Sequence, residues 1–438
     1  MEKKICMFVW NHFTNDARVM RECTALSEEG YDVDLLCIHN PNDKTMPFVE
    51  HVNERFTVIR VRRYPLIFLW MQGLLRAVKQ NRWLAVPLLT GWLLSLWILP
   101  LLTTALSIAI FTLLKTRLKK VVINLCIIMR MIRKGRQKQY DIYHANDLNT
   151  MPQGFICAKV RLRSRKLIYD SHEVQTSRTG YGRIHALLEK YFIRKADAMI
   201  VENHTRAEYN EELYGFYPNV VHNYPFKVSI KPENKVNLQE MLGLRKEEKI
   251  LLYQGGIQTG RGLDKLIEAV PMIKEGTVVL IGDGRIKKDL MVKVSEMQLE
   301  ERVKFLPKVP LKELPAYTAN AYLGFQILNN VCFNHYSASS NKLFEYMMAG
   351  IPVVACSFPE IRKVVEGEEI GLCIDSHNPA EIAWAVNELT QNREKRDCFS
   401  RNAILARHKY NWEIEKEVLI GLYDKLEEAN SNVSVNHR

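Results

Sequence analysis

A glycine-rich turn between Gly255 and Gly262 has the residue types that bind an anion. It follows the apolar run Ile250–Gln254 and precedes a segment with helical spacing. Glycine lets backbone N–H groups approach a phosphate closely, and the first turn of a helix favours negative charge. The guanidinium of Arg261 would add a forked donor for phosphate oxygens. The turn therefore predicts phosphate binding, with an ordinary strand-to-helix turn as the alternative.

A second group of polar residues lies in the segment Asn341–Ala355, where a helix is followed by a buried strand after Pro352. Lys342 and Glu345 are three residues apart and share one face of that helix. An amine suits a diphosphate and a carboxylate suits a ribose diol, whereas an exposed ion pair worth about a few tenths of a kcal/mol is the alternative. The predicted nucleotide-binding residues are Gly255, Gly256, Arg261, Gly282, Asn341, Lys342 and Glu345.

Histidine and carboxylate residues follow two predicted strands in the first half of the chain. His144–Asp147 ends one strand, and Asp170–Glu173 ends the next. Ligands of parallel α/β sheets bind beyond the carboxyl ends of the strands, so both segments could line a binding site. A single histidine at a strand end is more often structural, and this alternative stays open.

The segment Asn15–Glu22 opens the first predicted helix with charges of both signs. Asp16 suits the N-cap position. Arg18 or Arg21 could bind the phosphate of a substrate. The alternative is that Arg18 pairs with Glu22 one helical turn later.

These residues require a framework of parallel strands with helices between them. The predicted strands of the first half are Lys4–Trp10, Val33–Cys37, Phe56–Val61, Tyr140–Ala145, Lys166–Asp170 and Ala198–Glu202. The helix 16–29 is predicted to bury Val19, Met20, Cys23 and Leu26. Such a βαβ series forms a parallel sheet.

The second half repeats this alternation after a polar stretch rich in lysine and glutamate. The predicted strands are Ile250–Gln254, Thr277–Ile281, Val303–Leu306, Leu323–Ile327 and Val353–Ala355. The predicted fold class is α/β, with two Rossmann-like domains facing a cleft. The predicted boundaries are 1–226 for the first domain, 227–248 for a linker and 249–408 for the second domain. Residues 409–428 are predicted to form a C-terminal helix that packs back on the first domain. The tail from Asn430 is predicted to be disordered.

The stretch Arg55–Tyr140 contains 16 lysines and arginines in 86 residues and no acidic residue. The whole chain carries a net charge of +12, so the remainder carries −4. Within this stretch, the 32 residues Trp83–Leu114 have no charge. An apolar run with basic flanks is attracted to an anionic bilayer, whereas a nucleic-acid-binding surface would spread its cations over polar residues. Residues 64–138 therefore predict a membrane-associating helical insert, and nucleic-acid binding is not expected.

The insert leaves and rejoins one domain, which excludes a single crossing of the membrane. A break at Pro100 would give two helices of about 15 residues, or about 22 Å, which is short for a bilayer core. A shallow hairpin or in-plane helices are therefore favoured over two crossings. Lys115–Lys138 is predicted as an amphipathic helix in the membrane plane. A buried helical hairpin with solvated ends is the alternative.

The remaining sequence features favour a reducing compartment. Lys3-Lys4 leads into an apolar run too short for a secretory signal. The nine cysteines form no CxxC pair, and the histidines have no zinc-binding spacing. The expected location is the cytoplasmic face of the plasma membrane.

Three segments resemble motifs of the retaining glycosyltransferases of family 4, which have the two-domain GT-B fold. They are Gly255–Leu263, Gly282–Gly284 and Asn341–Ala355, in the order and spacing of that family. The resemblance covers nearly all of the chain except the insert. It implies that Arg261 and Lys342 hold the donor diphosphate and assist catalysis. It also implies that Glu345 binds the nucleotide ribose and that no metal or other cofactor is needed.

The resemblance assigns further residues to the substrates. Asn334–Ser340 would face the donor sugar, and Asn223 would lie at the domain junction. The acceptor side would include Asp16, Arg18 and His144.

The chain departs from the family pattern at three positions. Ser337 stands where the family often has the first glutamate of a Glu-x7-Glu motif. Asn146 stands where many members have a second histidine, and Gly256 stands where an arginine is common. With Asn146 in place of that histidine, the resemblance leaves Asp147 and His172 as the candidates for a general base.

The expected function is transfer of a sugar, with retention, from a UDP- or GDP-sugar to an acceptor at the membrane. A polyprenyl-linked saccharide in cell-surface glycan synthesis is the expected acceptor class. One alternative is a non-hydrolysing sugar-nucleotide epimerase, which shares this architecture and gives no reason for a membrane segment. The other is a membrane-bound, non-catalytic scaffold with a decayed donor site.

Overall fold

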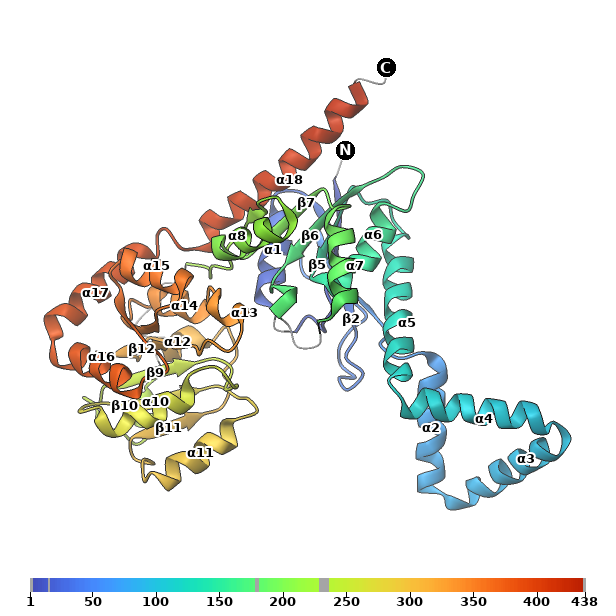
Figure 1. Ribbon diagram of the computed structural model, residues 1–438, viewed down its shortest axis with the longest axis horizontal. Helices are drawn as coiled ribbons and strands as arrows, with labels where there is room; N and C mark the ends of the chain where they lie inside the picture. The colour runs from blue at the N-terminus through green and yellow to red at the C-terminus, as the bar shows by residue number, and fades with distance from the viewer. Residues whose placement is uncertain (1–2, 15, 178–180, 228–235, 436–438) are drawn as a thin grey trace. The chain divides into compact units, whose positions relative to one another are not determined.

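The computed structural model describes residues 3–14, 16–177, 181–227 and 236–435 (Figure 1). The chain forms two compact units. Unit 1 comprises Met1–Asp16, Cys23–Asp170 and Tyr191–Asp197, and unit 2 comprises Ala17–Glu22, Ser171–Lys190 and Ala198–Arg438.

Unit 1 is built on a sheet whose strands lie in the order β3-β4-β2-β1-β5-β6. The strands are β1 Lys4–Phe8, β2 Asp32–Ile38, β3 Val49–His51, β4 Phe56–Val61, β5 Ile142–Asn146 and β6 Lys166–Ser171. Every adjacent pair in this order is parallel except β3 and β4, which are antiparallel. The predicted parallel sheet is thus confirmed for this unit. The sequence prediction missed β3 because its three residues are all exposed and form no apolar run.

The register of β1, β5 and β6 aligns the carboxyl ends of these strands, where the candidate catalytic residues were predicted. Phe8 pairs with Ala145, and Asn146 pairs with Asp170. Asn146 is buried and donates from Nδ2 to the carbonyl of Phe8 over 3.0 Å. The segment His144–Asp147 therefore lies at the carboxyl edge of the sheet, as predicted.

Helix α1, Ala17–Glu28, begins in unit 2 and ends in unit 1. Val19, Cys23 and Leu26 are fully buried, as their spacing predicts. Met20 is 39% exposed, so its predicted inward position is wrong. It lies one position past Val19, at the edge of the face defined by residues spaced by three and four.

Four helices follow β4 in unit 1. They are α2 Leu66–Gln80, α3 Ala85–Ile98, α4 Pro100–Lys115 and α5 Leu118–Gly135. The helix is interrupted at Leu99, whose backbone is not helical (φ −134°), and this residue separates α3 from α4. Pro100 is the first residue of α4, a position where the backbone N–H has no partner within the helix, so its absence in proline costs nothing. Helix α5 runs back to the sheet and packs against β2, β4 and α6, Met151–Ala158.

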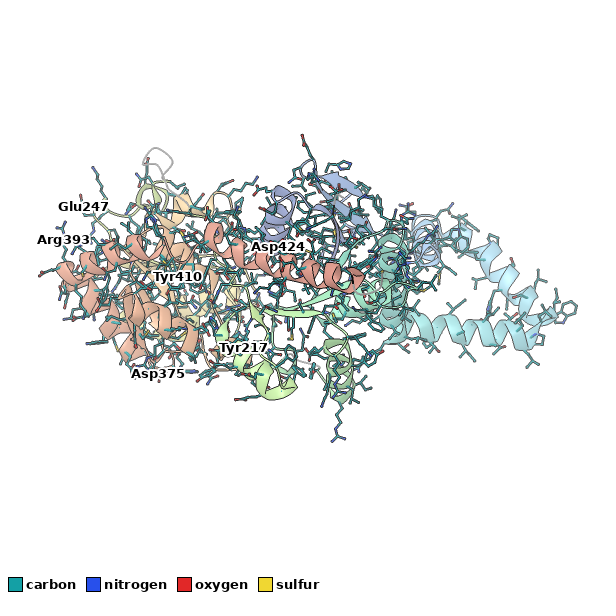
Figure 2. All side chains as sticks on the ribbon, turned by 90° about the horizontal axis from the view of Figure 1, so that it is seen from above. Tyr217, Glu247, Asp375, Arg393, Tyr410 and Asp424 are labelled. Atoms are coloured by element: carbon teal, nitrogen blue, oxygen red, sulfur yellow. The ribbon has the colours of Figure 1, made fainter. Side chains whose placement is uncertain are left out.

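The side chains of α3 and α4 are largely exposed within unit 1. In Figure 1 the two helices extend away from the sheet, and in Figure 2 their side chains, on the pale blue and cyan hairpin, stand apart from the rest of the unit. Trp97 of α3 and Leu101 of α4 are 83% and 87% exposed, and Trp83, in the short 3-10 helix η1 (Arg82–Leu84) that precedes α3, is 82% exposed. Among the residues that the structure describes, no helix combines the length and hydropathy of a membrane span.

Helix α5 is two-sided, as its sequence predicts. Ile127 and Met131 are buried against the unit, whereas Val121, Leu125 and Met129 are 49%, 53% and 68% exposed. The exposed row is apolar, and basic residues flank it at both ends of the helix. The amphipathic helix predicted at Lys115–Lys138 is therefore present, with an exposed face that is partly apolar.

Unit 2 contains a parallel six-stranded sheet in the order β11-β10-β9-β12-β13-β14. The strands are β9 Ile250–Gln254, β10 Thr277–Ile281, β11 Val303–Leu306, β12 Leu323–Gln326, β13 Val353–Cys356 and β14 Gly371–Ile374. Five of the six agree with the sequence prediction to within one residue at each end. In the same unit, β7, Ala198–Val201, pairs in parallel with β8, Asn219–Val220.

Helices cover both faces of the six-stranded sheet. Leu251 and Tyr253 pack with α10 Leu263–Ala269, α11 Lys287–Glu296 and α16 Pro379–Gln391. Ile250 and Leu252 pack on the other side with α14 Asn341–Met348, α15 Pro359–Gly367 and α17 Arg393–Ala406. The remaining helices are α7 Arg183–Ile193, α8 His204–Tyr214, α9 Leu238–Met241, α12 Leu314–Thr318, α13 Phe333–Tyr336 and α18 Trp412–Val435.

The C-terminal helix is longer than predicted. Because α18 continues to Val435 without a proline or glycine to end it, the predicted disorder from Asn430 is wrong up to that residue. The start of α18 is fixed by the segment that follows β8, since Trp412 N–H donates to the carbonyl of Pro225 over 2.9 Å. Glu415 also accepts a hydrogen bond from the backbone N–H of His222 over 2.7 Å. Residues 228–235 of the predicted linker lie outside the described residues.

Candidate active site

The glycine turn predicted to bind phosphate, at Gly255, and the turn at Gly282 lie against each other in unit 2. Gly255 N–H donates to the carbonyl of Ile281, and Ile257 N–H donates to the carbonyl of Asp283, each over 2.9 Å. A Cβ on Gly282 would lie 1.9 Å from the carbonyl oxygen of Gly255. Gly282 also has φ +155°, a conformation that other residues rarely adopt. Gly282 therefore lets the two turns meet.

Lys342 points from α14 at the first of these turns. The residue is 7% exposed, and its ammonium Nζ lies 4.2 Å from the centre of the Tyr253 ring. A Cβ built on Gly255 would lie 3.5 Å from Lys342 Cε, so glycine leaves room for the lysine. Burial, and then the nearby charge of Arg261, lower the pKa of Lys342 to about 7. The structure thus holds the amine of Lys342, which gains or loses its proton near pH 7, against the backbone of the turn.

Arg261 and His335 complete the cationic side of the site. Gly260 has φ +79°, and a Cβ there would lie 2.7 Å from Cε1 of His335, so the ring packs directly on the turn. The imidazole Nδ1 lies 3.2 Å from the carbonyl of Asn329. Burial and the charge of Arg261 hold the pKa of His335 below its usual range. His335 is therefore a neutral group beside the two cations near neutral pH.

Glu345 is positioned by the last residue of β9. Gln254 donates from Nε2 to Oε2 of Glu345, and Oε1 of Gln254 accepts a hydrogen bond from the hydroxyl of Thr318 over 2.7 Å. Burial raises the pKa of Glu345, while Gln254 and then Lys342 oppose that rise. The carboxylate is a half-buried acceptor held in one orientation, as a ribose-binding group requires.

Asn341 contacts a chain of polar residues at the start of α14. It accepts a hydrogen bond from Nδ2 of Asn223 over 3.0 Å, and Asn223 accepts one from the guanidinium of Arg21. The guanidinium of Arg21 also lies 5.7 Å from the centre of the Trp412 ring. Arg21 is thus held by α18 and by the segment after β8. This geometry favours a positioning role for Asn223 and Arg21.

Ser337, at the position of the missing glutamate, is fully buried, and its hydroxyl is used in two hydrogen bonds. Its hydroxyl donates to the carbonyl of Phe333 over 2.8 Å and accepts from Nε of Arg206 over 3.2 Å. Arg206 is 4% exposed and pairs with Glu202 at 2.5 Å. A glutamate at position 337 would place a second carboxylate beside Glu202. The serine is therefore part of a buried network around Arg206.

The predicted catalytic residue His172 meets the same network through its backbone. Its carbonyl oxygen accepts a hydrogen bond from Arg206 Nη1. Asn334 also contacts this segment, since its Oδ1 accepts from the N–H of Val174 over 2.8 Å. The arginine thereby fixes the backbone of His172, and a role of the imidazole as base stays a prediction.

The candidate residues of unit 1 gather at the carboxyl ends of β5 and β6. His144 is fully buried, and its Nε2 lies 3.4 Å from Oδ2 of Asp170. Asp147 has φ +63°, and its N–H donates to the carbonyl of Asp170 over 2.7 Å. A non-glycine residue in the left-handed region is uncommon, and such strain concentrates at functional sites. The backbone of Asp147 thus agrees with a functional role at this sheet edge.

The remaining predicted residues have local partners. Oδ2 of Asp16 accepts from the amide of Asn11 over 2.7 Å. Arg18 pairs with Glu22 at 3.5 Å, which confirms the alternative of an ion pair one helical turn apart. A side chain at Gly256 would meet only Gln258, at 3.6 Å, so no contact in the structure requires glycine there.

Unit 2 therefore brings together most of the nucleotide-binding residues predicted from the sequence. Arg261, Lys342 and Glu345 are electrostatically coupled around the turn at Gly255. Sequence reasoning missed Tyr253 and Gln254, which orient the lysine and the glutamate. Gln254 could have been found from the sequence, because it is a polar residue at the end of an otherwise apolar strand. The arrangement can neutralise a diphosphate with two cations while a carboxylate accepts hydroxyl protons.

Two family models match successive parts of the chain. Residues 16–225 match the model described as glycosyl transferase 4-like domain, and residues 234–406 match the model described as glycosyl transferases group 1. Among curated proteins, the chain is 26% identical over 262 residues to D-inositol 3-phosphate glycosyltransferase of Thermomonospora curvata. That alignment covers 55% of this chain and 59% of the relative. The chain spans little more than half the length of the curated relatives it matches.

Solved structures resemble the chain over nearly its full length. Sucrose-phosphate synthase from Thermosynechococcus elongatus has a TM-score of 0.72 and 16% identity, covering 98% of this chain and 100% of that one. HepE of Anabaena, in complex with UDP-glucose, has a TM-score of 0.66 and 15% identity, covering 98% and 99%. At these identities the likeness shows the fold. It confirms the predicted α/β architecture of two domains with parallel sheets, the GT-B fold.

Proposed function

We propose, from the premise that this chain belongs to the group 1 glycosyltransferases, that it transfers a sugar with retention from a nucleotide-sugar donor to a lipid-linked acceptor. One observation carries the proposal. The buried ammonium of Lys342 and the guanidinium of Arg261 lie beside the glycine turn at Gly255, with Glu345 on the same helix as the lysine. Two cations suit a diphosphate, and the carboxylate suits a ribose.

The rate of the reaction would depend on how strongly this site stabilises the nucleotide as it leaves the sugar. Negative charge develops on the diphosphate as the bond to the sugar breaks, and Lys342 and Arg261 would stabilise it. Attack by the acceptor from the face that the diphosphate leaves would retain the configuration. Asp147 and His172 are the candidates to receive the acceptor proton. Because the chain supplies its own cations, we propose that no metal or other cofactor takes part.

The donor proposed is a UDP- or GDP-sugar. Support for a uridine nucleotide comes from the similar HepE structure of Anabaena, which is described in complex with UDP-glucose. His335 is the residue of the predicted sugar-facing segment that packs on the phosphate turn, whereas Ser337 is buried behind it. We therefore propose that His335 takes the place of the missing glutamate beside the donor sugar.

The acceptor proposed is a polyprenyl-linked saccharide at the cytoplasmic face of the plasma membrane. Support comes from the helices α2–α4 of the stretch without acidic residues. Trp83, Trp97 and Leu101 are more than four-fifths exposed, and lysines and arginines lie at both ends of the apolar run. With 14 and 16 residues, α3 and α4 reach only about 21 and 24 Å, which favours shallow insertion over two crossings.

A panel of nucleotide sugars tests the proposed activity. The chain is incubated with each labelled UDP- or GDP-sugar and washed membranes, and label is followed into the lipid extract. Transfer from one donor into lipid is expected. Conversion of the nucleotide sugar without any acceptor would instead establish the epimerase alternative and contradict the proposal.

Donor binding is expected to weaken above pH 7. The pKa of free Lys342 is about 7, and a bound diphosphate would raise it, so binding takes up a proton. Affinity is then fully present below pH 7 and falls up to about tenfold per pH unit until the pKa of the complex is reached. Calorimetry with a nucleotide sugar, in two buffers that differ in ionisation enthalpy, measures the uptake. Unchanged affinity between pH 6.5 and about 8.5 would count against Lys342 as the diphosphate ligand.

The exposed residues of the hairpin are expected to hold the chain on membranes. Changing Trp83, Trp97 and Leu101 together to alanine removes apolar surface that would enter the bilayer, so most of the protein should fail to float with anionic vesicles. Leu405→Ala is the matched control, because that leucine is 68% exposed in unit 2 and outside the insert. Flotation of the triple variant at the level of the control contradicts the role of the hairpin.

A further inference from the structure

A second cationic site lies in unit 1, where α5 returns to the sheet. A cavity of about 440 Å³ opens between the end of α5 and the strands β3 and β4. Five of its lining residues are cations, and none is acidic. They are Arg60, Arg62, Arg130, Arg133 and Lys134. The glycine turns of the candidate active site belong to unit 2, so this cavity is a different site.

Three of these cations are available to a ligand. Arg62, Arg133 and Lys134 are exposed and have no acidic partner among the described residues. Arg130 is used structurally, since its Nη1 donates to the carbonyls of Arg62 and Tyr64 over 2.5 and 3.0 Å. The three cations therefore line a cavity beside the backbone corner at residues 62–64, which the hydrogen bonds of Arg130 hold in place.

The buried Arg60 forms the inner wall of the cavity. It is 6% exposed, and it donates to Glu50 over 2.7 Å and to the carbonyl of Pro47 over 3.1 Å. Its buried Nε has no hydrogen-bond partner among the described residues. A buried N–H without a partner costs free energy, so Arg60 is held in this wall at a cost to stability. Glu50 neutralises one of the five charges, so the site keeps a clear positive excess.

One side of the cavity is apolar and continues toward α2. Phe48 and Val49 line it and are 43% and 51% exposed, and the guanidinium of Arg62 lies 5.5 Å from the centre of the Phe48 ring. Just past the corner held by Arg130, Leu66 and Ile67 open α2 with 62% and 63% exposure. A ligand with an anionic head and an apolar body would match both surfaces.

We propose that this cavity binds the phosphate group of an anionic lipid, with the glycerol and the first methylenes of its chains against the apolar side. The positive charge of Arg62, Arg133 and Lys134 selects the phosphate, and the apolar side selects lipid over a free phosphate. The proposal deepens the proposed membrane association, on which it rests for the origin of the lipid. Binding of a soluble short-chain lipid does not depend on a membrane or on the donor site.

Calorimetric titration of the full chain with three soluble probes tests the proposal. Dihexanoyl phosphatidate is expected to bind, and glycerol 3-phosphate, which has the same head and no chains, at least about tenfold more weakly. Dihexanoyl phosphatidylcholine, whose head carries no net charge, is expected to bind at least about tenfold more weakly as well. Equal affinity for phosphatidate and glycerol 3-phosphate would overturn a lipid site in favour of a free-phosphate site.

A pair of double variants tests where the lipid binds. Changing Arg133 and Lys134 to glutamine should weaken phosphatidate binding about thirtyfold or more, through lost charge-assisted hydrogen bonds. Changing Lys119 and Lys120 to glutamine removes the same charge from the other end of α5 and should leave binding unchanged. Equal losses of phosphatidate affinity in the two double variants would overturn the proposed site at this cavity and indicate general attraction to a basic helix. Donor binding in unit 2 should be unaffected in both, which separates failure here from failure of the proposed transferase activity.

Discussion

Replacing Lys342 by methionine is expected to lower kcat/KM for sugar transfer by about a hundredfold to a thousandfold. Loss of one preorganised group that stabilises developing charge has about this effect in water-excluded sites. Methionine keeps the length and apolar stem of the lysine, so the packing on Tyr253 and Gly255 is preserved. The rate of transfer from the preferred nucleotide sugar measures the effect.

Stability distinguishes this effect from misfolding. Burial lowers the pKa of Lys342 to about 7, so below pH 7 the folded chain holds a charged amine that water would solvate better. Stability from this group rises with pH between about 7 and 10.5, because the unfolded chain binds the extra proton there. The melting temperature of Lys342→Met should therefore not fall at pH 6.5. Lys363→Met, at an exposed position on α15, is the matched control and should keep full activity. Full activity of Lys342→Met would remove the lysine from the proposed site.

Replacing Gly282 by alanine is expected to weaken donor binding about a hundredfold through the backbone alone. The new Cβ would lie 1.9 Å from the carbonyl oxygen of Gly255, and φ at this position is +155°. The two turns must then separate by more than about 1 Å, a displacement that costs roughly a hundredfold where a diphosphate is to be held. The strained conformation also lowers stability by about 1–3 kcal/mol. Calorimetric donor affinity and thermal unfolding measure the two effects.

Gly421→Ala provides the control for a glycine without contacts. Nothing lies within 4 Å of a Cβ at that position, which is inside α18. Alanine there should keep donor affinity and raise stability by about 0.5–1 kcal/mol, since alanine favours a helix more than glycine does. Wild-type donor affinity in Gly282→Ala would show that contact between the two turns does not shape the site.

The grouping of the candidate nucleotide-binding residues in unit 2 could be predicted in part, because short local patterns encode the elements that contain them. The apolar strand β9, the glycines after it and the helix containing Lys342 and Glu345 each have a short-range pattern. A parallel sheet then brings the carboxyl ends of β9 and its neighbours together. The i, i+3 spacing predicted that Lys342 and Glu345 share one helical face, whereas a common role of Arg261 and Lys342 was implied only by the family resemblance.

Contacts between distant segments could not be predicted in this way. Thr318 orients Gln254 from 64 residues away, and Arg206 reaches Ser337 from 131 residues away. The sequence showed that Ser337 departs from the family motif, but only the structure shows that the hydroxyl is buried against Arg206. The cavity beside Arg60 was missed for the same reason, because β4 and α5 are far apart in the chain and no local motif marks it.

The structure also refines the account of the stretch without acidic residues. Its charge pattern predicted contact with an anionic surface, and Pro100 predicted the break between α3 and α4. Which apolar residues are exposed could not be predicted, since α5 turns Ile127 and Met131 inward while Leu125 and Met129 stay outside. Packing on the sheet decides that division.

Calorimetric titration of UDP and GDP into the chain and into Lys342→Met tests the central claim most directly. The account predicts that one nucleotide binds to the unaltered chain with a stoichiometry of one, and that the variant loses most of this affinity while it stays folded. No heat from either nucleotide would favour a scaffold with a decayed donor site. Equal binding to both proteins would show that the diphosphate lies elsewhere, and either result would contradict the account.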